Sequence, residues 1–201
     1  MERRIIDSAH DGASGPERSW SGLLLLLLLR PHQWIKNGFV LIGFLFGHEW
    51  GNLQVLSSVL ALFAAFCATA SAVYIYNDLH DVEADRLHPR KCRRPIASGA
   101  LPVGMAWCLC IALASLGLLL ALYASHTGAL LIGAYAVMNV AYTHRLKHVV
   151  ILDIFIISTG FMLRILAGTV GVGIEPSQWL LLCGFMLTLF LGFAKRRAEL
   201  A

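Results

Sequence analysis

Charged side chains are scarce in this chain of 201 residues. Only 14% of the residues are Asp, Glu, Lys or Arg, whereas 58% are hydrophobic. Since a soluble domain carries about a quarter charged residues, this composition argues against a water-soluble fold and favours a membrane protein. The net charge of +4 is small, and no basic face is interleaved with aromatic residues. The sequence therefore does not predict a nucleic-acid partner.

Metal and disulfide patterns built on cysteine or histidine are also lacking. The five cysteines and eight histidines show no spacing of zinc ligands, and the cysteines form no disulfide framework. The sequence therefore predicts neither a zinc protein nor a small disulfide-stabilised domain.

Long apolar runs, in contrast, recur along the chain. A transmembrane helix needs about 20 mostly apolar residues, and residues 34–48 are the weakest candidate because Lys36 and Asn37 interrupt them. We predict a mobile tail at residues 1–22 and an all-α, polytopic transmembrane helix bundle at residues 23–201. The predicted spans are 34–48, 53–77, 102–123, 128–143, 149–170 and 178–194.

Lys and Arg are distributed unevenly between the predicted loops. Loops 49–52, 124–127 and 171–177 contain none, whereas most of these residues lie in the tail and in segments 78–101, 144–148 and 195–197. By the positive-inside rule, the N-terminus and these three segments face the cytoplasm. The prediction is a multi-pass protein of a bacterial inner membrane.

A dense polar block follows the second predicted span. Asn77, Asp81 and Asp85 are four residues apart, so a continuous helix would place them in one stripe with Asp78 beside it. Carboxylates hold hard cations such as Mg²⁺, and the arginines that follow, among them Arg94, can hold phosphate oxygens. The block predicts a magnesium diphosphate site, although a solvated loop that only fixes membrane orientation is the simpler alternative.

Two further polar clusters are predicted at the same membrane face. Tyr142 and Lys147 stand near the end of the fourth predicted span and Asp153 begins the fifth, while Lys195 and Arg196 end the sixth. Each cluster can contact phosphates or position a substrate. The alternative is that their cations are topogenic charges and Tyr142 an interfacial aromatic residue.

Arg164 is unusual because it lies inside a predicted span. Such a charge is costly, and it normally faces a bundle interior or a water-filled cavity. Asp153 lies eleven residues earlier, about 20° away around an ideal helix and about 16 Å along it. Both side chains can therefore face one cavity without forming a direct salt bridge. Snorkelling of Arg164 to an interface is the alternative.

The polar block also matches a known motif. The pattern N-D-x-x-D-x-x-x-D fits residues 77–85 without a gap, and R-P-x-x-S-G fits residues 94–99. The chain thus resembles the UbiA superfamily of intramembrane prenyltransferases. Within it, residues 29–37 (L-R-P-H-Q-W-I-K-N), 142–153, 163–168 and 195–200 resemble the decaprenyl-phosphate phosphoribosyltransferase branch.

The resemblance implies a bundle of about nine transmembrane helices around a central cavity. Because this sequence contains only about six predicted spans, we expect the bundle to be truncated at its C-terminal end. It implies Mg²⁺-dependent transfer of a 5-phosphoribosyl group from phosphoribosyl diphosphate to polyprenyl (decaprenyl) phosphate, with release of diphosphate. One alternative moves a prenyl group from prenyl diphosphate to an aromatic acceptor. Another is a non-catalytic or transporter-like membrane protein. The oligomeric state, a homo-oligomer included, stays open.

The roles implied for individual residues follow from these motifs. The metal ligands are Asn77, Asp78, Asp81 and Asp85. The catalytic residues are Asp78, Asp81, Asp85 and Asp153. The substrate-binding residues are Lys36, Asn77, Arg94, Tyr142, Lys147, Arg164, Lys195 and Arg196.

Overall fold

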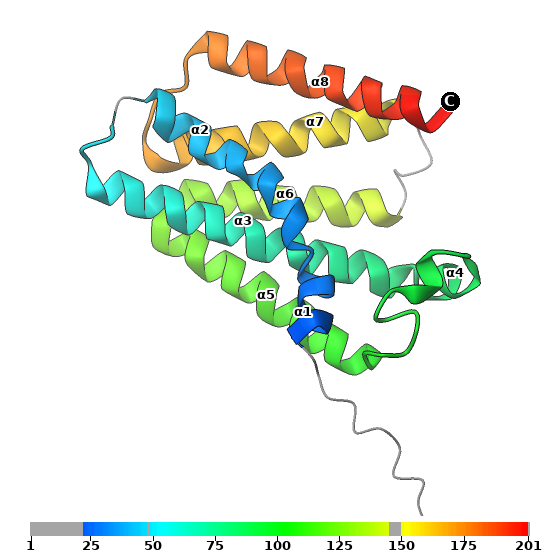
Figure 1. Cartoon of the computed structure of the whole chain (residues 1–201). Helices are drawn as coiled ribbons and strands as arrows, with labels where there is room; N and C mark the ends of the chain where they lie inside the picture. The colour runs from blue at the N-terminus through cyan, green and yellow to red at the C-terminus, as the bar shows by residue number, and fades with distance from the viewer. Residues whose placement is uncertain (1–21, 48, 145–149, 201) are drawn as a thin grey trace, which may run out of the picture.

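The computed structural model describes residues 22–47, 49–144 and 150–200, and within these ranges it contains helices and no strand (Figure 1). The predicted all-α class is therefore confirmed. Of the predicted tail, only Gly22 lies among the described residues, as the first residue of α1. The elements are α1 (Gly22–Leu29), η1 (Pro31–Gly38), α2 (Phe39–Phe46), α3 (Leu53–His80), α4 (Val82–Leu87), η2 (Lys91–Arg93), α5 (Val103–Ala124), α6 (His126–His144), α7 (Val150–Ala167), η4 (Val170–Val172) and α8 (Gln178–Leu200).

Three helical segments within the described ranges are long and apolar enough to cross a membrane: Leu53–His80, Val103–Ala124 and Leu152–Val172. They correspond to the predicted spans 53–77, 102–123 and 149–170. The other two long helices are marginal. α6 has the length but carries several polar residues, and the apolar part of α8, Gln178–Ala194, is shorter.

The predicted span at residues 34–48 is wrong as a single helix. Its first residues belong to η1, a 3₁₀ helix, and only Phe39–Phe46 are α-helical. An eight-residue α-helix is about 12 Å long, far less than the hydrocarbon core of about 30 Å. Trp34 and Asn37 of η1 donate hydrogen bonds to Ser71 and Cys67 of α3, so this segment does not form an apolar helix facing lipid.

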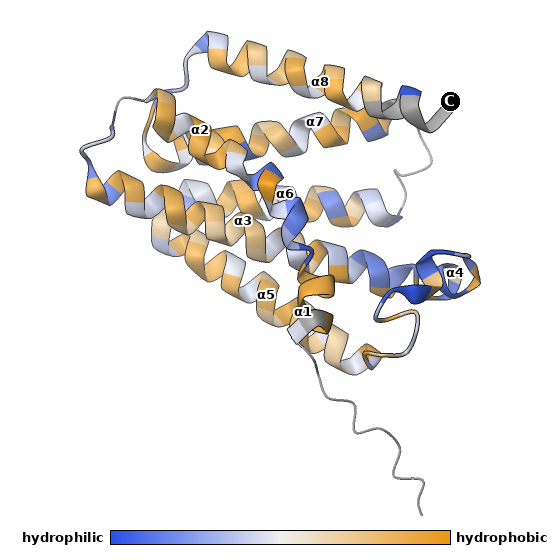
Figure 2. Ribbon diagram, in the orientation of Figure 1, coloured by the Kyte–Doolittle hydropathy of each residue, from blue (hydrophilic) through white to orange (hydrophobic). Residues whose placement is uncertain are grey.

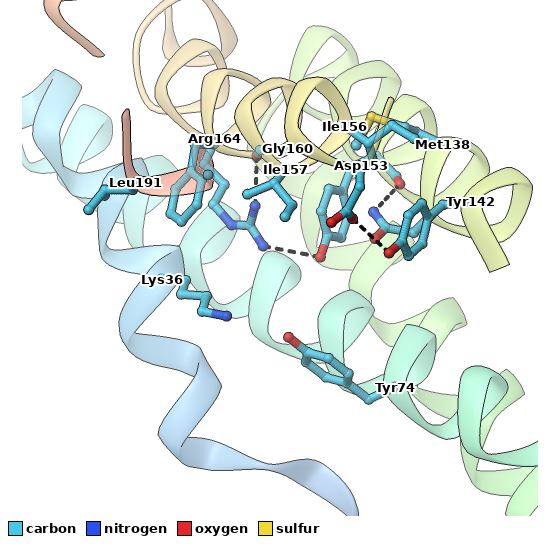
Figure 3. A pocket seen from close by; sticks show the side chains of 14 residues that line it. Lys36, Tyr74, Met138, Tyr142, Asp153, Ile156, Ile157, Gly160, Arg164 and Leu191 are labelled. Carbon is cyan, nitrogen blue, oxygen red and sulfur yellow. Dashed lines mark hydrogen bonds between the residues drawn. The ribbon is translucent and has the colours of Figure 1, made fainter. Parts of the chain in front are cut away.

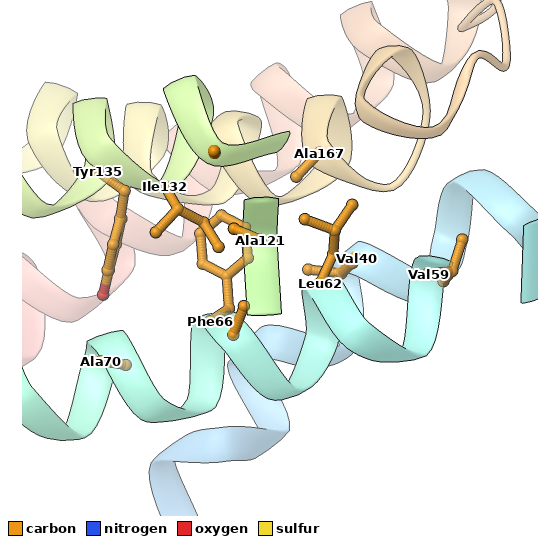
Figure 4. Packing of buried hydrophobic residues seen from close by; sticks show 11 residues of the cluster. Val40, Val59, Leu62, Phe66, Ala70, Ala121, Ile132, Tyr135 and Ala167 are labelled. Atoms are coloured by element: carbon orange, nitrogen blue, oxygen red, sulfur yellow. The ribbon is translucent and has the colours of Figure 1, made fainter. Parts of the chain in front are cut away.

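α3 is the central helix of the fold. Asn52 caps its start by accepting hydrogen bonds from the N–H groups of Gln54 and Val55, at 3.1 and 3.2 Å. It packs most extensively against α5, and it also contacts α1, η1, α2 and α6. A buried cluster of apolar side chains joins α3 to α2, α5, α6 and α7 (Figure 4); its members are Val40, Val59, Leu62, Ala65, Phe66, Ala70, Ala121, Ala129, Ile132, Tyr135 and Ala167.

Two glycines let α2 lie against α7. A Cβ atom at Gly168 would overlap the carbonyl oxygen of Val40, and one at Gly43 would overlap the carbonyl oxygen of Gly168. Small residues at such crossings allow membrane helices to approach closely. The short α2 is thereby held against the bundle although it is too short to span a membrane.

Polar residues gather at one end of the bundle. Figure 2 shows hydrophilic residues concentrated at α4 and the C-terminal end of α3. In Figure 1 the C-terminal ends of α6 and α8 and the N-terminal end of α7 point toward the same end. The described parts of the three polar segments recognised in the sequence therefore belong to one end of the bundle.

Candidate active site

The segment η1 and the residue before it run antiparallel along one face of α3. The contacts on α3 are four, three and four residues apart, which is the spacing of a single helix face. Their hydrogen bonds range from 2.8 to 3.4 Å. The pairs, in order along the chain, are Arg30 with Asp78, Gln33 with Tyr74, Trp34 with Ser71, and Asn37 with Cys67.

Two buried carboxylates and two arginines form a cluster at the end of α3. Asp78 is 6% and Asp85 2% exposed. Arg30 Nη2 donates to both carboxylate oxygens of Asp78, at 2.9 and 2.8 Å. Arg94 Nη1 donates to Asp78 Oδ1 at 2.9 Å and to Asp85 Oδ2 at 2.6 Å. The Arg94 guanidinium thus bridges the carboxylates of Asp78 and Asp85, and the Arg30 guanidinium forms a second ion pair with Asp78.

The prediction that Asn77, Asp81 and Asp85 form one continuous helical stripe is wrong. α3 ends at His80, and Asp81 lies in a turn before α4. A straight helix would separate Asp78 from Asp85 by about 10 Å along its axis, yet both contact the same nitrogen of Arg94. The turn at Asp81 therefore brings these two carboxylates together.

The remaining two predicted metal ligands have other partners. Asp81 Oδ1 lies 3.1 Å from His80 Nδ1, at a partly exposed position. Asn77 Oδ1 accepts a hydrogen bond from the buried Thr143 hydroxyl of α6. Among the described residues, Asp78, Asp81 and Asp85 do not form a three-carboxylate group placed to hold a metal.

The donor set at Asp78 and Asp85 nevertheless fits Mg²⁺. Among the described residues, no group of three or more His, Cys, Asp or Glu side chains is placed to hold a metal. Mg²⁺ usually takes one or two carboxylates and completes its octahedron with water and substrate phosphates. Two buried carboxylates beside two arginines supply hard oxygen ligands together with phosphate-binding cations.

A cavity of about 430 Å³ lies between η1, α3, α6, α7 and α8 (Figure 3). Tyr74 connects it to the carboxylate cluster, because the guanidinium of Arg30 lies 5.1 Å from the centre of the Tyr74 ring. Four of the predicted substrate-binding or catalytic residues line this cavity: Lys36, Tyr142, Asp153 and Arg164.

Tyr142 and Asp153 form one wall of the cavity. The Tyr142 hydroxyl donates to Asp153 Oδ1 at 2.7 Å, joining α6 to α7. Asp153 is 8% exposed. Its carboxylate is therefore fixed in orientation and available at the cavity surface, as Figure 3 shows.

Arg164 lies deeper along the same helix. Its Nε donates to Asn37 Oδ1 at 2.8 Å, its Nη1 to the Gly160 carbonyl at 2.7 Å, and its Nη2 to the Tyr135 hydroxyl at 3.1 Å. Asp153 and Arg164 line one cavity without forming an ion pair, as their spacing on one helix predicts.

Three predicted phosphate-binding residues cannot be placed. Lys147 lies outside the described residues, and Lys195 and Arg196 lie in α8 but their side chains are not described. The sequence reasoning missed Arg30 and Thr143. Arg30 stands in the L-R-P-H-Q-W-I-K-N motif, and only the antiparallel contact of that motif with α3 reveals its partner.

Two known proteins are similar to this chain over most of its length. A decaprenyl-phosphate phosphoribosyltransferase of Corynebacterium glutamicum is 44% identical over 180 residues, covering 88% of this chain and 54% of the relative. The protein of the same name from Mycolicibacterium smegmatis is 40% identical over 200 residues, covering 98% of this chain and 62% of the relative. The chain therefore spans a little over half the length of these relatives.

The fold also has a counterpart among solved structures. A UbiA homolog from Archaeoglobus fulgidus, bound to DMAPP and Mg²⁺, is 25% identical with a TM-score of 0.69; the match covers 82% of this chain and 59% of that one. The model of the UbiA prenyltransferase family matches residues 38–198. These similarities and the apolar helices identify an integral membrane protein that belongs to the UbiA prenyltransferase family.

Proposed function

We propose that this chain carries the donor site of a Mg²⁺-dependent polyprenyl-phosphate phosphoribosyltransferase. The reaction moves a 5-phosphoribosyl group from phosphoribosyl diphosphate to a polyprenyl phosphate such as decaprenyl phosphate. The observation that carries the proposal is the buried pair Asp78 and Asp85, held by Arg30 and Arg94 beside a cavity within a membrane helix bundle. The names of the relatives support the choice of donor and acceptor.

Asp78 and Asp85 are the residues that would hold Mg²⁺, with Asn77 as a neutral oxygen ligand. Bound Mg²⁺ supplies electrostatic stabilisation of the charge that develops on departing diphosphate. Arg30 and Arg94, which contact carboxylates in this structure, can donate to diphosphate oxygens when the donor binds. The Mg²⁺ in the solved relative supports this assignment.

The transfer itself is a substitution at the anomeric carbon. The bond between that carbon and the diphosphate oxygen breaks, and diphosphate leaves with the electron pair. A bond forms between the carbon and an oxygen of the lipid phosphate. Asp153, oriented by Tyr142, accepts hydrogen bonds from the ribose hydroxyls and so positions the sugar.

The polar end of the bundle faces the cytoplasm of a bacterial inner membrane in this proposal. The donor is highly charged and water-soluble, so its site has to open to water. The carboxylate cluster lies at the end where the basic segments gather, and the positive-inside rule assigns that end to the cytoplasm. Lys147, Lys195 and Arg196 remain proposed phosphate contacts there.

A transfer assay in membranes tests the proposal. Labelled phosphoribosyl diphosphate, polyprenyl phosphate and Mg²⁺ should yield a labelled lipid. Asp85→Asn should lower turnover by about 10²–10³, the usual effect of removing a preorganised charge-stabilising group. The matched control is Glu83→Gln, because Glu83 lies in the same short helix but is 82% exposed and pairs with Arg86. Folded protein that forms no labelled lipid, or an Asp85→Asn variant with normal turnover, would contradict it.

A second candidate is prenyl transfer to an aromatic acceptor. The observation in its favour is the solved relative that holds DMAPP with Mg²⁺. The leaving group of this reaction is also diphosphate, so the same carboxylates would hold Mg²⁺ and the same arginines would bind the diphosphate oxygens. Product from a prenyl diphosphate and an aromatic acid, but none from phosphoribosyl diphosphate, would favour this candidate.

A further inference from the structure

Arg164 is a buried cation that has no acidic partner among the described residues. It is 7% exposed, and none of the ion pairs formed among the described residues involves it. Asp153 on the same helix is about 16 Å away along the axis and accepts a hydrogen bond from Tyr142. Because an arginine is not deprotonated in proteins, its charge is kept in the bundle interior, and no carboxylate in the described part of the chain compensates it. Such charges in membrane segments commonly mark a substrate or ion site.

The guanidinium is held in one orientation by neutral groups. Its three hydrogen bonds go to an amide oxygen, a backbone carbonyl and a hydroxyl. The rings of Phe66, Tyr135 and Phe161 lie 5.6, 4.7 and 5.6 Å from its central carbon, which favours the charge but does not neutralise it. Of the five N–H donors of arginine, two are left by these bonds, on a residue that lines the cavity.

Lys36 places a second cation on the same cavity. It lies next to Asn37, the residue that accepts from Arg164 Nε, and Figure 3 shows its amine directed into the cavity that Arg164 also lines. The carboxylate cluster lies elsewhere. Asn37 contacts α3 at Cys67, eleven residues before Asp78, which corresponds to about 16 Å along that helix.

We propose that Arg164 and Lys36 form a second anion subsite, which binds a phosphomonoester. This inference rests on the proposed function, in which both substrates carry such a group: the 5-phosphate of the donor and the phosphate of the lipid acceptor. No carboxylate lies beside this guanidinium among the described residues, so the subsite binds its ligand without a metal, unlike the diphosphate site. A fixed guanidinium matches the geometry of phosphate oxygens.

Equilibrium binding to the whole chain in lipid nanodiscs tests this subsite. Three probes are used: ribose 5-phosphate for the donor, farnesyl monophosphate for the acceptor, and inorganic pyrophosphate with Mg²⁺ for the carboxylate cluster. Arg164→Gln should weaken one of the two phosphomonoesters at least tenfold and leave Mg²⁺-pyrophosphate within twofold. The phosphomonoester that is lost identifies the source of the ligand. Arg164→Lys should lose less affinity for that phosphomonoester than Arg164→Gln does, because lysine keeps the positive charge.

Two further variants keep the test decisive. Lys36→Gln removes the other cation from a more exposed position and should weaken the same phosphomonoester, even if Arg164→Gln fails to fold. Arg90→Gln, which removes an exposed cation outside the cavity, should leave both phosphomonoester affinities unchanged. The subsite is refuted if wild-type protein binds neither phosphomonoester, or if both cavity variants weaken all three probes equally.

The binding data also separate this inference from the proposed function. Selective loss of a phosphomonoester in a protein that transfers no phosphoribosyl group would support the subsite and contradict the reaction. Normal transfer by wild-type protein, with phosphomonoester affinities unchanged in both variants, would support the reaction and overturn the subsite.

Discussion

Arg94 is expected to be the most important cation for stability at the end of α3. It makes the one ion pair that Asp85 forms within the described residues, whereas Asp78 also has Arg30. Arg94→Gln therefore leaves Asp85, 2% exposed, as a buried charge without a cation. Removing one partner of a buried pair costs about 3–5 kcal/mol. Because the Arg94 side chain is 30% exposed, we expect the lower end of that range.

The size of this effect can be measured as the free energy of unfolding in mixed detergent micelles, followed by circular dichroism. Arg30→Gln should cost less, because Asp78 keeps Arg94. Adding Asp85→Asn to Arg94→Gln should restore most of the loss, because the unpaired charge disappears; such coupling is expected for residues in one network. An Arg94→Gln variant within about 0.5 kcal/mol of wild type, the usual range of surface changes, would refute the reasoning. A double variant of Arg94→Gln with Asp85→Asn would also refute it if its loss of unfolding free energy equalled the sum of the losses of the two single variants.

Two other predictions follow from the packing and from the carboxylates. Gly168→Ala should destabilise the protein strongly, because its Cβ would overlap the carbonyl oxygen of Val40. Gly133→Ala should be harmless, since nothing beyond its chain neighbours and its own helix backbone lies within 4 Å of the Cβ position. Thermal unfolding of both variants compares their stabilities. Asp78→Asn should weaken Mg²⁺-pyrophosphate binding at least tenfold more than Asp81→Asn. Asp81 pairs with His80, and among the described residues it does not form a three-carboxylate group with Asp78 and Asp85. Calorimetric titration measures both, and equal losses would show that Asp81 joins the metal site when ligand binds.

The helices and the residues that approach the site follow from sequence pattern, but their pairing does not. The N-D-x-x-D-x-x-x-D motif pointed to the end of α3, and the isolated charge of Arg164 predicted a position facing a cavity. The motif alone could not show that Asp78 and Asp85 meet, since that depends on the turn at Asp81. Nor could apolar periodicity find Arg30, whose partner lies 48 residues away in the chain.

Residues 30–38 show how a segment too polar and too short for a span still packs against the bundle. Its polar groups bond to α3 and α7, so they are not left unsatisfied in an apolar environment. Arg30 reaches Asp78 at one end, and Asn37 reaches Arg164 at the other. From Arg30 to Asn37, seven residues at the 3₁₀ rise cover about 14 Å. This is close to the axial separation of about 16 Å between Asp78 and Cys67, their partners on α3. This one segment therefore connects the carboxylate cluster to the buried guanidinium, and in the proposed function a substrate that occupies both sites has to span the length of the segment.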